Sequence, residues 1–355
     1  MKPDETWNGK LHADLYKEAA KEVDPEKDPA AHSQLFRELL KKRFYGQLPC
    51  SLWPYNGSHN WEDPAAEGRN ALGYGSEPGK EKDLYGAQKE AGGRLSTFEG
   101  ALARGCLELW SNEGDLVLDP FAGRGARLHA TLHSGRDYVG FDTSDDALLA
   151  CERAAQGFDE SRFALYHSSS LFLSDYLPPE STDFVFTCPP YWNSEFYGDN
   201  GHGSEAAPTY RAFVEELCAV LLLAAETLKE ERYLCLVLRG FFLHGHFHDT
   251  PAHVAEVLCA SGLLLHDKVA KKMGSSRERF HQDVAKLRRT AQVHEEVLVF
   301  KKTKVRKGKR RERELVMEKN KRRLLEEQHL AARRSDVLAR FGAHPRPSLP
   351  YEEDV

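Results

Sequence analysis

The chain has 355 residues, of which 41% are hydrophobic and 29% charged, with a formal net charge of −6. These values predict a soluble protein with a proper core, large enough for one decorated domain or two modest ones. The sequence has no apolar run of membrane-spanning length and no secretory leader, which favours an intracellular protein. Its seven cysteines show no CxxC spacing, which argues against a disulfide framework or a zinc site.

Residues 1–93 are predicted to form an N-terminal extension. Leucines at helical spacing on both sides of the break at Val23–Ala30 predict two short helices. From residue 44 to residue 93, glycines are interspersed with aromatic residues. Such a stretch is typical of a loop that wraps the core or contacts a ligand.

Residues 94–302 alternate regularly between helix and strand patterns. Helices are predicted over 100–110, 126–133, 145–156, 210–228 and 251–261, and strands over 115–119, 138–142, 162–167, 183–187 and 233–238. The segments 263–270 and 295–301 predict a closing hairpin around a basic loop. This order predicts an α/β domain with a mostly parallel sheet and right-handed crossovers.

Residues 303–355 are predicted to form a basic helical arm followed by a disordered tail. Thirteen Lys or Arg stand against three Glu between residues 301 and 323, a local balance of +10, which suits a polyanionic partner. The apolar stripe is narrow, so a solvated helix and an arm that contacts phosphates both stay open. The basic run 304–313 would also suit a nuclear-import signal if the source is eukaryotic.

The segment Asp119–Gly125, DPFAGRG, follows a predicted strand and opens a predicted helix, as a nucleotide-type loop does. Gly123 and Gly125 lack a Cβ atom and would let the backbone approach a ligand closely. Asp142 ends the next strand, where a carboxylate can accept hydrogen bonds from both ribose hydroxyls. The loop lacks the full GxGxxG pattern, so its ligand need not carry a pyrophosphate.

The segment Thr187–Trp192, TCPPYW, follows the apolar run 183–186. Two prolines cannot continue a strand, so the chain leaves the sheet at the carboxyl end, where ligands bind in open α/β sheets. The aromatic pair after the turn offers a flat surface to a planar ring. Taken alone, the segment could also be a strand terminator with two packing aromatics.

Together the two motifs resemble the amino-methyltransferase family of DNA methylases, which modify adenine N6 or cytosine N4 with S-adenosylmethionine. Ser96–Glu99 resembles the segment with the family's cofactor-capping Phe, and His294–Phe300 resembles its closing strand. The resemblance covers residues 94–302 and is greatest to phage-type methylases with a CPPY motif. It implies a class I S-adenosylmethionine-dependent methyltransferase fold, Rossmann-like, with a seven-stranded sheet closed by a β-hairpin.

The resemblance also implies roles for individual residues. The cofactor would contact Phe98, Asp119, Phe121, Gly123, Gly125, Asp142 and Ser169, and the target base would contact Cys188, Pro189, Pro190 and Tyr191. The Pro189 carbonyl and the Cys188 side chain would hold the hydrogens of the amino group and free its lone pair for attack on the methyl group. Tyr191 would stack on a base flipped out of DNA.

Two positions depart from the family pattern. Cys188 stands where Asp, Asn or Ser is usual, and a thiol is a weak acceptor. Cys is nearest in size to the Ser of the cytosine-N4 form, which favours cytosine N4 over adenine N6. Ser169 lies where many relatives have Gly-Asp after the third strand. An inactive protein that keeps the fold and binds nucleic acid stays open, as does an RNA amino-methyltransferase, since related motifs also serve RNA.

The loop between the two strands of the hairpin is predicted to clamp a DNA strand. Phosphate contacts are expected from Lys271, Lys272, Arg277, Arg279, Arg288 and Arg289, while Phe280 would fill the space of the flipped base and Trp192 would also contact DNA. A solvated hairpin loop is the alternative. The insertion 195–208 could close over the target base.

Two other chemistries are less favoured. Pyrimidine C5 methylation uses a Cys that follows a proline, whereas Cys188 precedes two prolines. His244, His246 and His248 alternate in a predicted loop without Cys or a carboxylate frame, so exposed loop histidines are favoured over a metal site.

Overall fold

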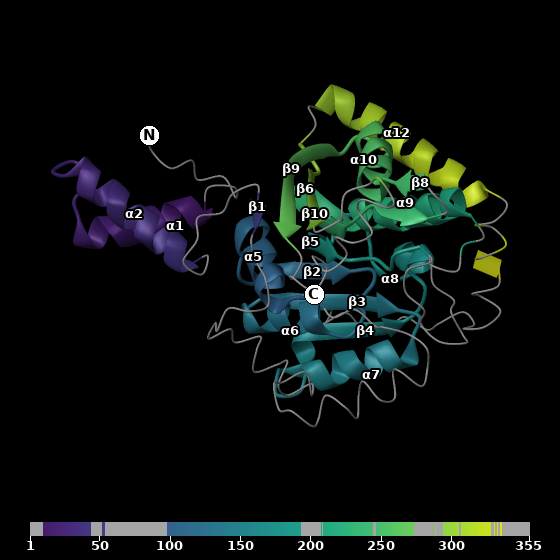
Figure 1. Cartoon of the computed structure of the whole chain (residues 1–355), viewed down its shortest axis with the longest axis horizontal. Coiled ribbons are helices and arrows are strands. Elements are labelled where there is room, and N and C mark those ends of the chain that lie inside the picture. The colour runs from purple at the N-terminus through teal and green to yellow at the C-terminus, as the bar shows by residue number, and fades with distance from the viewer. Residues whose placement is uncertain are drawn as a thin grey trace.

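The computed structural model describes residues 10–43, 52–53, 98–192, 207, 209–243, 246–272, 288, 294–304, 307–327, 330, 332 and 334–335. Its centre is a sheet of strand order β1-β9-β10-β6-β5-β2-β3-β4 (Figure 1). The strands are β1 (Leu52–Trp53), β2 (Leu116–Asp119), β3 (Asp137–Asp142), β4 (Phe163–His167), β5 (Thr182–Thr187), β6 (Leu228–Leu238), β9 (Leu264–Lys272) and β10 (His294–Lys301).

The strand directions confirm the predicted fold class. Strands β2 to β6 pair in parallel, and β10 is antiparallel to both of its neighbours, β6 and β9. A parallel doubly wound sheet with one antiparallel strand inserted next to its edge is the class I methyltransferase arrangement. The eighth strand, β1, was not predicted; it is two residues long and pairs in parallel with β9.

The helices cover both faces of the sheet. On one face lie α5 (Gly100–Trp110), α6 (Ala126–His133) and α7 (Asp145–Ala154), and on the other lie α8 (Leu173–Tyr176), α9 (Tyr210–Thr227) and α10 (Thr250–Ala260). Alternate residues of β2 serve the two cores, because side chains of a strand point to opposite faces. Leu118 packs with α9, whereas Val117 packs with α5. All these helices except the single turn α8 were predicted.

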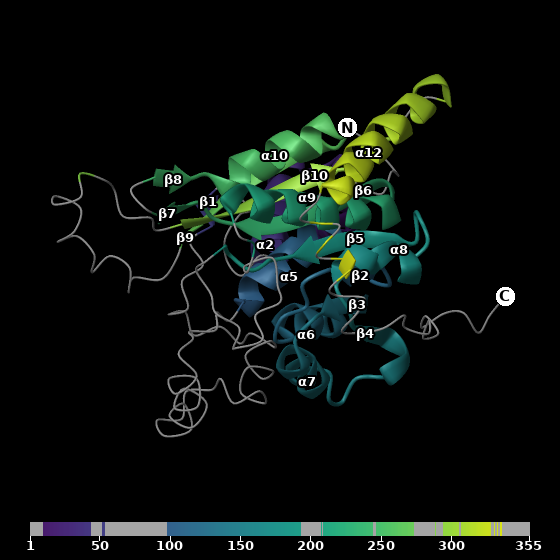
Figure 2. The ribbon, with the colours of Figure 1, turned by 90° about the vertical axis from the view of Figure 1, so that its right-hand side faces the viewer.

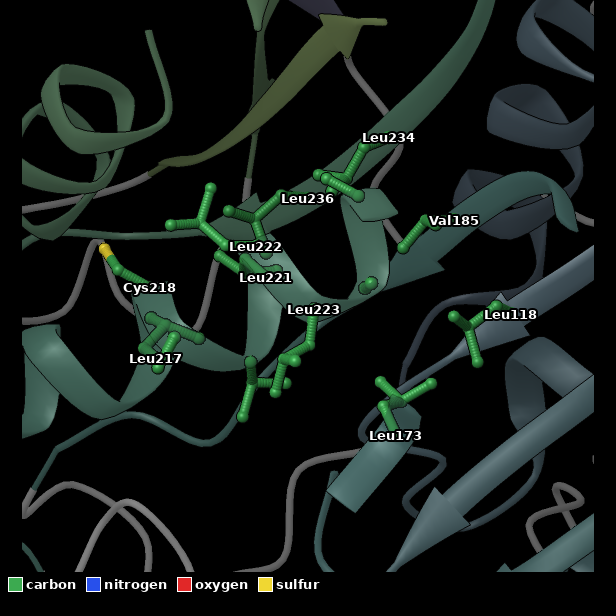
Figure 3. Close-up of a cluster of buried hydrophobic side chains, with 14 of the residues drawn as sticks. Leu118, Leu173, Val185, Leu217, Cys218, Leu221, Leu222, Leu223, Leu234 and Leu236 are labelled. Atoms are coloured by element: carbon green, nitrogen blue, oxygen red, sulfur yellow. The ribbon is translucent and has the colours of Figure 1, made fainter. Parts of the chain in front are cut away.

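The larger core lies between α9 and the sheet. Figure 3 shows Leu217, Leu221 and Leu222 of α9 beside Leu234 and Leu236 of β6 and Val185 of β5. These side chains are at most a few per cent exposed. Their burial fixes the carboxyl ends of β2, β5 and β6 next to one another, which is where both sequence motifs begin.

The N-terminal extension contains the two predicted helices, α1 (Lys10–Glu22) and α2 (Pro29–Arg43), which pack against each other. The basic arm contains α12 (Lys307–Glu326), which lies along α9 and α10 in both views (Figures 1 and 2). No helix in the described part of the chain is long and apolar enough to cross a membrane.

The described part of α12 is anchored to the domain. Leu324 and Leu330 are buried in the core of α9, and Lys321 forms an ion pair with Glu226 at 2.7 Å. Asn320 donates to Ser261 Oγ at 3.1 Å. The narrow apolar stripe of α12 is therefore enough to dock this helix on the α/β domain.

The loop predicted after β6 is a β-hairpin instead. Strands β7 (Phe241–Leu243) and β8 (His246–His248) pair antiparallel directly after β6. His248 lies against the Tyr210 ring, with ring centroids 4.3 Å apart, so it is a packed residue rather than a loop histidine. The described residues contain no group of three side chains that could hold a metal ion.

Candidate functional site

The turn between β2 and α6 depends on two glycines in the left-handed region, with φ of 58° at Gly123 and 82° at Gly125. They serve different purposes. A Cβ on Gly125 would lie 2.7 Å from the Cβ of Ala154, so this glycine is required for the approach of α6 to α7. A Cβ on Gly123 would meet nothing closer than 3.8 Å. Only Gly123 thus has the open side that close approach of a ligand requires.

Asp119 is the buried centre of the site, with none of its surface exposed. Its Oδ1 accepts hydrogen bonds from Thr187 Oγ1 at 2.7 Å and from the backbone N–H of Phe121 at 3.2 Å. Its Oδ2 accepts from Arg127 Nε at 2.7 Å and from the Tyr138 hydroxyl at 3.1 Å. Four protein donors surround the carboxylate, so Asp119 organises the site in place of the direct cofactor contact that was predicted.

Arg127 balances this buried charge. Burial opposes the charge on the guanidinium, but the neighbouring Asp119 carboxylate outweighs it and raises the pKa of Arg127. Arg127 also donates to the Phe121 carbonyl, and its guanidinium lies 4.9 Å from the ring centroid of Phe98. Phe98 packs edge-on against Phe186 of β5 at 5.7 Å. The predicted capping residue, Phe98, is therefore held against both the loop and β5.

Asp142 ends β3 beside this loop. Its Oδ2 accepts from the backbone N–H of Gly123 at 2.9 Å, and its Oδ1 accepts from the N–H of Ser144 at 3.0 Å. The side chain is partly exposed, and each carboxylate oxygen can accept more than one hydrogen bond. The acidic strand end is thus fixed in orientation while it keeps a surface for hydroxyl groups.

Ser169 lies at the start of the short helix after β4. Its hydroxyl accepts from the N–H of Leu171 at 3.4 Å, while Ser170 donates to the Pro120 carbonyl at 2.6 Å. Pro120 belongs to the Asp119–Gly125 turn, so the end of β4 is tied to that turn. Phe121, predicted to contact the cofactor, is partly buried and packs against the α9 core.

The Cys188–Tyr191 turn begins where Thr187 bonds to Asp119, which brings the two motifs together. Cys188 is partly exposed and Pro189 is buried. Tyr191 is only 4% exposed; its hydroxyl donates to Glu295 Oε1 at 3.2 Å, and the Arg239 guanidinium lies 4.7 Å from its ring centroid. The prediction that the Tyr191 ring stacks on the target base does not fit this arrangement, since the ring is already covered.

Trp192 belongs to an aromatic cluster at the same edge of the sheet. Its indole N–H donates to the Ala207 carbonyl at 3.0 Å, and its ring lies 5.6 Å from Tyr210 and 6.2 Å from Phe241. On the β7–β8 hairpin, Phe242 and Phe247 are 37% and 48% exposed, with ring centroids 4.9 Å apart. The hairpin therefore presents two neighbouring exposed rings at the edge of the sheet where the Cys188–Tyr191 turn lies.

The predicted DNA contacts have mixed outcomes. Lys271 is buried and paired with Glu99 at 3.0 Å and Glu295 at 3.4 Å, so it is a structural cation rather than a phosphate ligand. Burial lowers the pKa of Lys271, but the two carboxylates outweigh it and raise that pKa overall. Lys272 is partly exposed and Arg288 is exposed. The remaining predictions, Arg277, Arg279, Phe280 and Arg289, lie outside the described residues, as does most of the insertion 195–208.

Sequence reasoning missed the residues that join the motifs. Arg127, Tyr138 and Thr187 converge on Asp119, and Glu295 and Arg239 converge on Tyr191. The available signal was positional: Arg239 directly follows β6, the strand next to β5, and so lies at the same carboxyl edge as Cys188. Glu295 lies in the closing strand, whose register with β6 could not be read from the sequence.

One family model matches part of the chain. Residues 31–153, about a third of the sequence, match the family model described as DNA methylase. The match begins in α2 and ends in α7, so it contains the Asp119–Gly125 loop and Asp142 but not the Cys188–Tyr191 turn. It confirms the resemblance predicted from the sequence and supports S-adenosylmethionine as the cofactor.

Several solved structures have a similar fold. TrmN from Thermus thermophilus is 18% identical, with a TM-score of 0.41 over 64% of this chain and 54% of that chain. Geranyl diphosphate C-methyltransferase from Streptomyces coelicolor A3(2) is 11% identical, with a TM-score of 0.42 over 66% and 88%. An S-adenosylmethionine dependent methyltransferase from Mesorhizobium loti is 12% identical, with a TM-score of 0.35 over 53% and 91%.

The chain therefore spans about half the length of TrmN. At these identities and TM-scores the structures say nothing about activity, and the fold assignment rests on the strand order. No curated protein matched the chain.

Proposed function

We propose that this protein methylates the exocyclic amino group of a base in DNA, with cytosine N4 favoured over adenine N6. The observation that carries the proposal is the 2.7 Å hydrogen bond from Thr187 to Asp119. It joins the methylase-type loop to the Cys-Pro-Pro turn at one sheet edge, so a cofactor on the first would meet a base on the second. The family match supports DNA as the substrate.

The residues present fit S-adenosylmethionine. Gly123 leaves room for close approach, and Asp142 keeps a partly exposed carboxylate that can accept from ribose hydroxyls. Phe98, fixed by Arg127 and Phe186, would cap the cofactor from the side of α5. When bound, the cofactor supplies an electrophilic methyl group on a sulfonium.

The base side follows from the geometry of the Pro-Pro turn. An exocyclic amino group is a poor nucleophile because its lone pair is delocalised into the ring. The Pro189 carbonyl and the Cys188 sulfur would accept its two hydrogens and so localise the lone pair, in a position fixed in advance by Thr187 and Asp119. A side chain of the size of Cys or Ser at position 188 favours cytosine.

Side chains suited to contact DNA lie around the carboxyl edge of the sheet. Arg239 follows β6 and places its guanidinium beside the turn, and the exposed pair Phe242 and Phe247 offers rings for base stacking. The basic α12 segment carries further positive charge. Such a set suits a strand with a flipped nucleotide, which needs phosphate contacts and stacking partners.

The test is incubation of the full chain with labelled S-adenosylmethionine and with DNA or RNA, followed by nucleoside mass spectrometry. N4-methylcytosine in DNA is the expected product. N6-methyladenine would correct the base, and a methylated nucleoside from RNA alone would replace DNA by RNA. Measurable cofactor binding without any methylated nucleoside would identify an inactive nucleic-acid-binding protein.

A substitution at position 188 tests whether the thiol accepts a hydrogen bond or attacks the base. Cys188→Ser is expected to keep substantial activity, because the residue only accepts a hydrogen bond. A dead Cys188→Ser variant, together with a covalent adduct between the wild type and a C5-fluorinated pyrimidine, would show instead that the thiol attacks the ring.

A further inference from the structure

A series of polar contacts runs from Cys188 along the carboxyl edge of the sheet to β10 and β9. The Cys188 sulfur lies 4.0 Å from the Tyr191 hydroxyl oxygen, within the range of a sulfur hydrogen bond. The Tyr191 hydroxyl donates to Glu295 Oε1 at 3.2 Å. Since that hydroxyl has a single proton, its oxygen is left as an acceptor on the side of Cys188.

The carboxylate end of this series is held firmly. Glu295 Oε2 lies 3.4 Å from the Lys271 ammonium, which also pairs with Glu99 Oε2 at 3.0 Å. The three side chains are between 11% and 18% exposed. The Arg239 guanidinium lies over the Tyr191 ring, 4.7 Å from the ring centroid. The Lys271 ammonium thus pairs with both carboxylates and holds Glu295 in place beneath Tyr191.

We propose that Glu295 is a positioning residue for methyl transfer: through Tyr191 it fixes the Cys188 thiol as a hydrogen-bond acceptor towards the target amino group. The proposal rests on the proposed amino-methyltransferase function. A thiol can point either its proton or its lone pairs at a substrate. Because the contacts run from Cys188 to Tyr191 to Glu295 and end on a carboxylate, the S–H proton is directed to the Tyr191 oxygen and the sulfur lone pairs face outward.

This arrangement explains how a Cys serves where relatives use a carboxylate or amide. An aspartate at this position has no proton and needs no orientation, whereas a thiol presents the wrong group in part of its rotamers. The contact of the Cys188 thiol with the Tyr191 hydroxyl, which itself donates to Glu295, removes those rotamers. Tyr191 then contributes through its hydroxyl, which accounts for a ring that is buried rather than free to stack.

A double-mutant cycle between positions 188 and 191 tests the proposal. With Cys at position 188, Tyr191→Phe and Glu295→Gln are each expected to lower kcat about fivefold to tenfold, the loss expected for one hydrogen bond, with little change in cofactor affinity. In a Cys188→Asp background the same two substitutions are expected to change kcat less than about twofold, because the carboxylate has no proton to orient. Equal losses in both backgrounds would show a merely structural role and overturn the proposal.

An infrared measurement tests this proposal separately from the proposed function, because the measurement requires no turnover. The S–H stretching band of Cys188 is obtained as the infrared difference between the wild type and Cys188→Ala. We expect Tyr191→Phe and Glu295→Gln to shift this band towards that of a free thiol. An unchanged band in Tyr191→Phe refutes the series of contacts even if the enzyme is active. A shifted band in a protein that methylates nothing supports the contacts and rejects the function.

Discussion

Replacing Thr187 by Val removes the hydroxyl that joins the two motifs while keeping the shape of the side chain. The lost hydrogen bond is 2.7 Å long, is buried and ends on an ionised carboxylate. Such bonds contribute about 1.5–3 kcal/mol to stability. Asp119 Oδ1 keeps the N–H of Phe121, and Oδ2 keeps Arg127, so the carboxylate stays paired. We therefore expect a loss in the free energy of unfolding at the low end of this range, about 1.5–2 kcal/mol.

Thr187→Val should lower kcat by more than its small effect on the free energy of unfolding would suggest. Thr187 directly precedes Cys188, so the turn loses its anchor, and a small displacement of a catalytic group can cost about a hundredfold in rate. We expect kcat of Thr187→Val to fall at least about tenfold. The assays are urea unfolding, for the free energy of unfolding, and single-turnover methylation. Thr187→Ser, which keeps the hydroxyl, is the matched control.

Two results would refute this reasoning. If Thr187→Val unfolds at the wild-type urea concentration, the hydrogen bond to Asp119 contributes nothing. If Thr187→Ser loses as much activity as Thr187→Val, the methyl group matters rather than the hydroxyl, and the bond does not hold the turn.

Three further predictions concern the cofactor side, the buried lysine and the C-terminal helix. Asp142→Asn should weaken S-adenosylhomocysteine binding about tenfold by calorimetry, since an amide accepts fewer hydrogen bonds than a carboxylate; unchanged affinity would place the ribose elsewhere. Lys271→Gln should destabilise the protein, whereas Lys272→Gln should not. The folded-state pKa of Lys271 is raised, so its contribution is present at neutral pH and is lost as pH rises above about 10 and through that pKa. A pH-independent difference in unfolding free energy between the wild type and Lys271→Gln would contradict this. Leu330→Ala should cost about 2–5 kcal/mol and Leu315→Ala less than about 0.5 kcal/mol, because Leu330 is fully buried and Leu315 is 61% exposed; equal unfolding free energies would show that the C-terminal segment is not docked.

The docking of α12 also changes how its charge should be tested. Deleting residues 303–355 would remove Leu324 and Leu330 from the core, so weaker DNA binding could follow from instability alone. Charge-neutralising substitutions between Lys307 and Arg313 keep both leucines in place. If the basic segment contacts phosphates, they should flatten the salt dependence of DNA binding while unfolding stays unchanged.

Periodicity and turn chemistry were enough to predict the sheet and its main helices. The buried runs before Asp119 and Thr187 have the apolar character of central parallel strands, and the helix–strand alternation with a closing hairpin predicted a mostly parallel sheet. The sequence pattern also placed both motifs at one edge. It did not predict the β7–β8 hairpin, although Gly245 stands between the two strands, because each strand has only three residues and the segment is rich in histidine.

The roles of polar residues were harder to predict, because they depend on partners far along the chain. Asp119 looked like a cofactor ligand until Thr187 and Tyr138 were seen to occupy it. Lys271 looked like a phosphate contact, yet its partners Glu99 and Glu295 come from two other elements. Side-chain charge is visible in a sequence, whereas burial and register decide whether that charge faces solvent or another charge.

One consequence is that the Asp119–Gly125 loop and the Cys188–Tyr191 turn form a single hydrogen-bonded unit. Asp119 bonds to Thr187 of the turn and, through Arg127 and the N–H of Phe121, to the loop. A shift of the loop is therefore transmitted to the turn by buried hydrogen bonds rather than through solvent. Binding of the cofactor should then order the Cys188–Tyr191 turn, and substitutions at Thr187 and Asp142 should have non-additive effects on kcat.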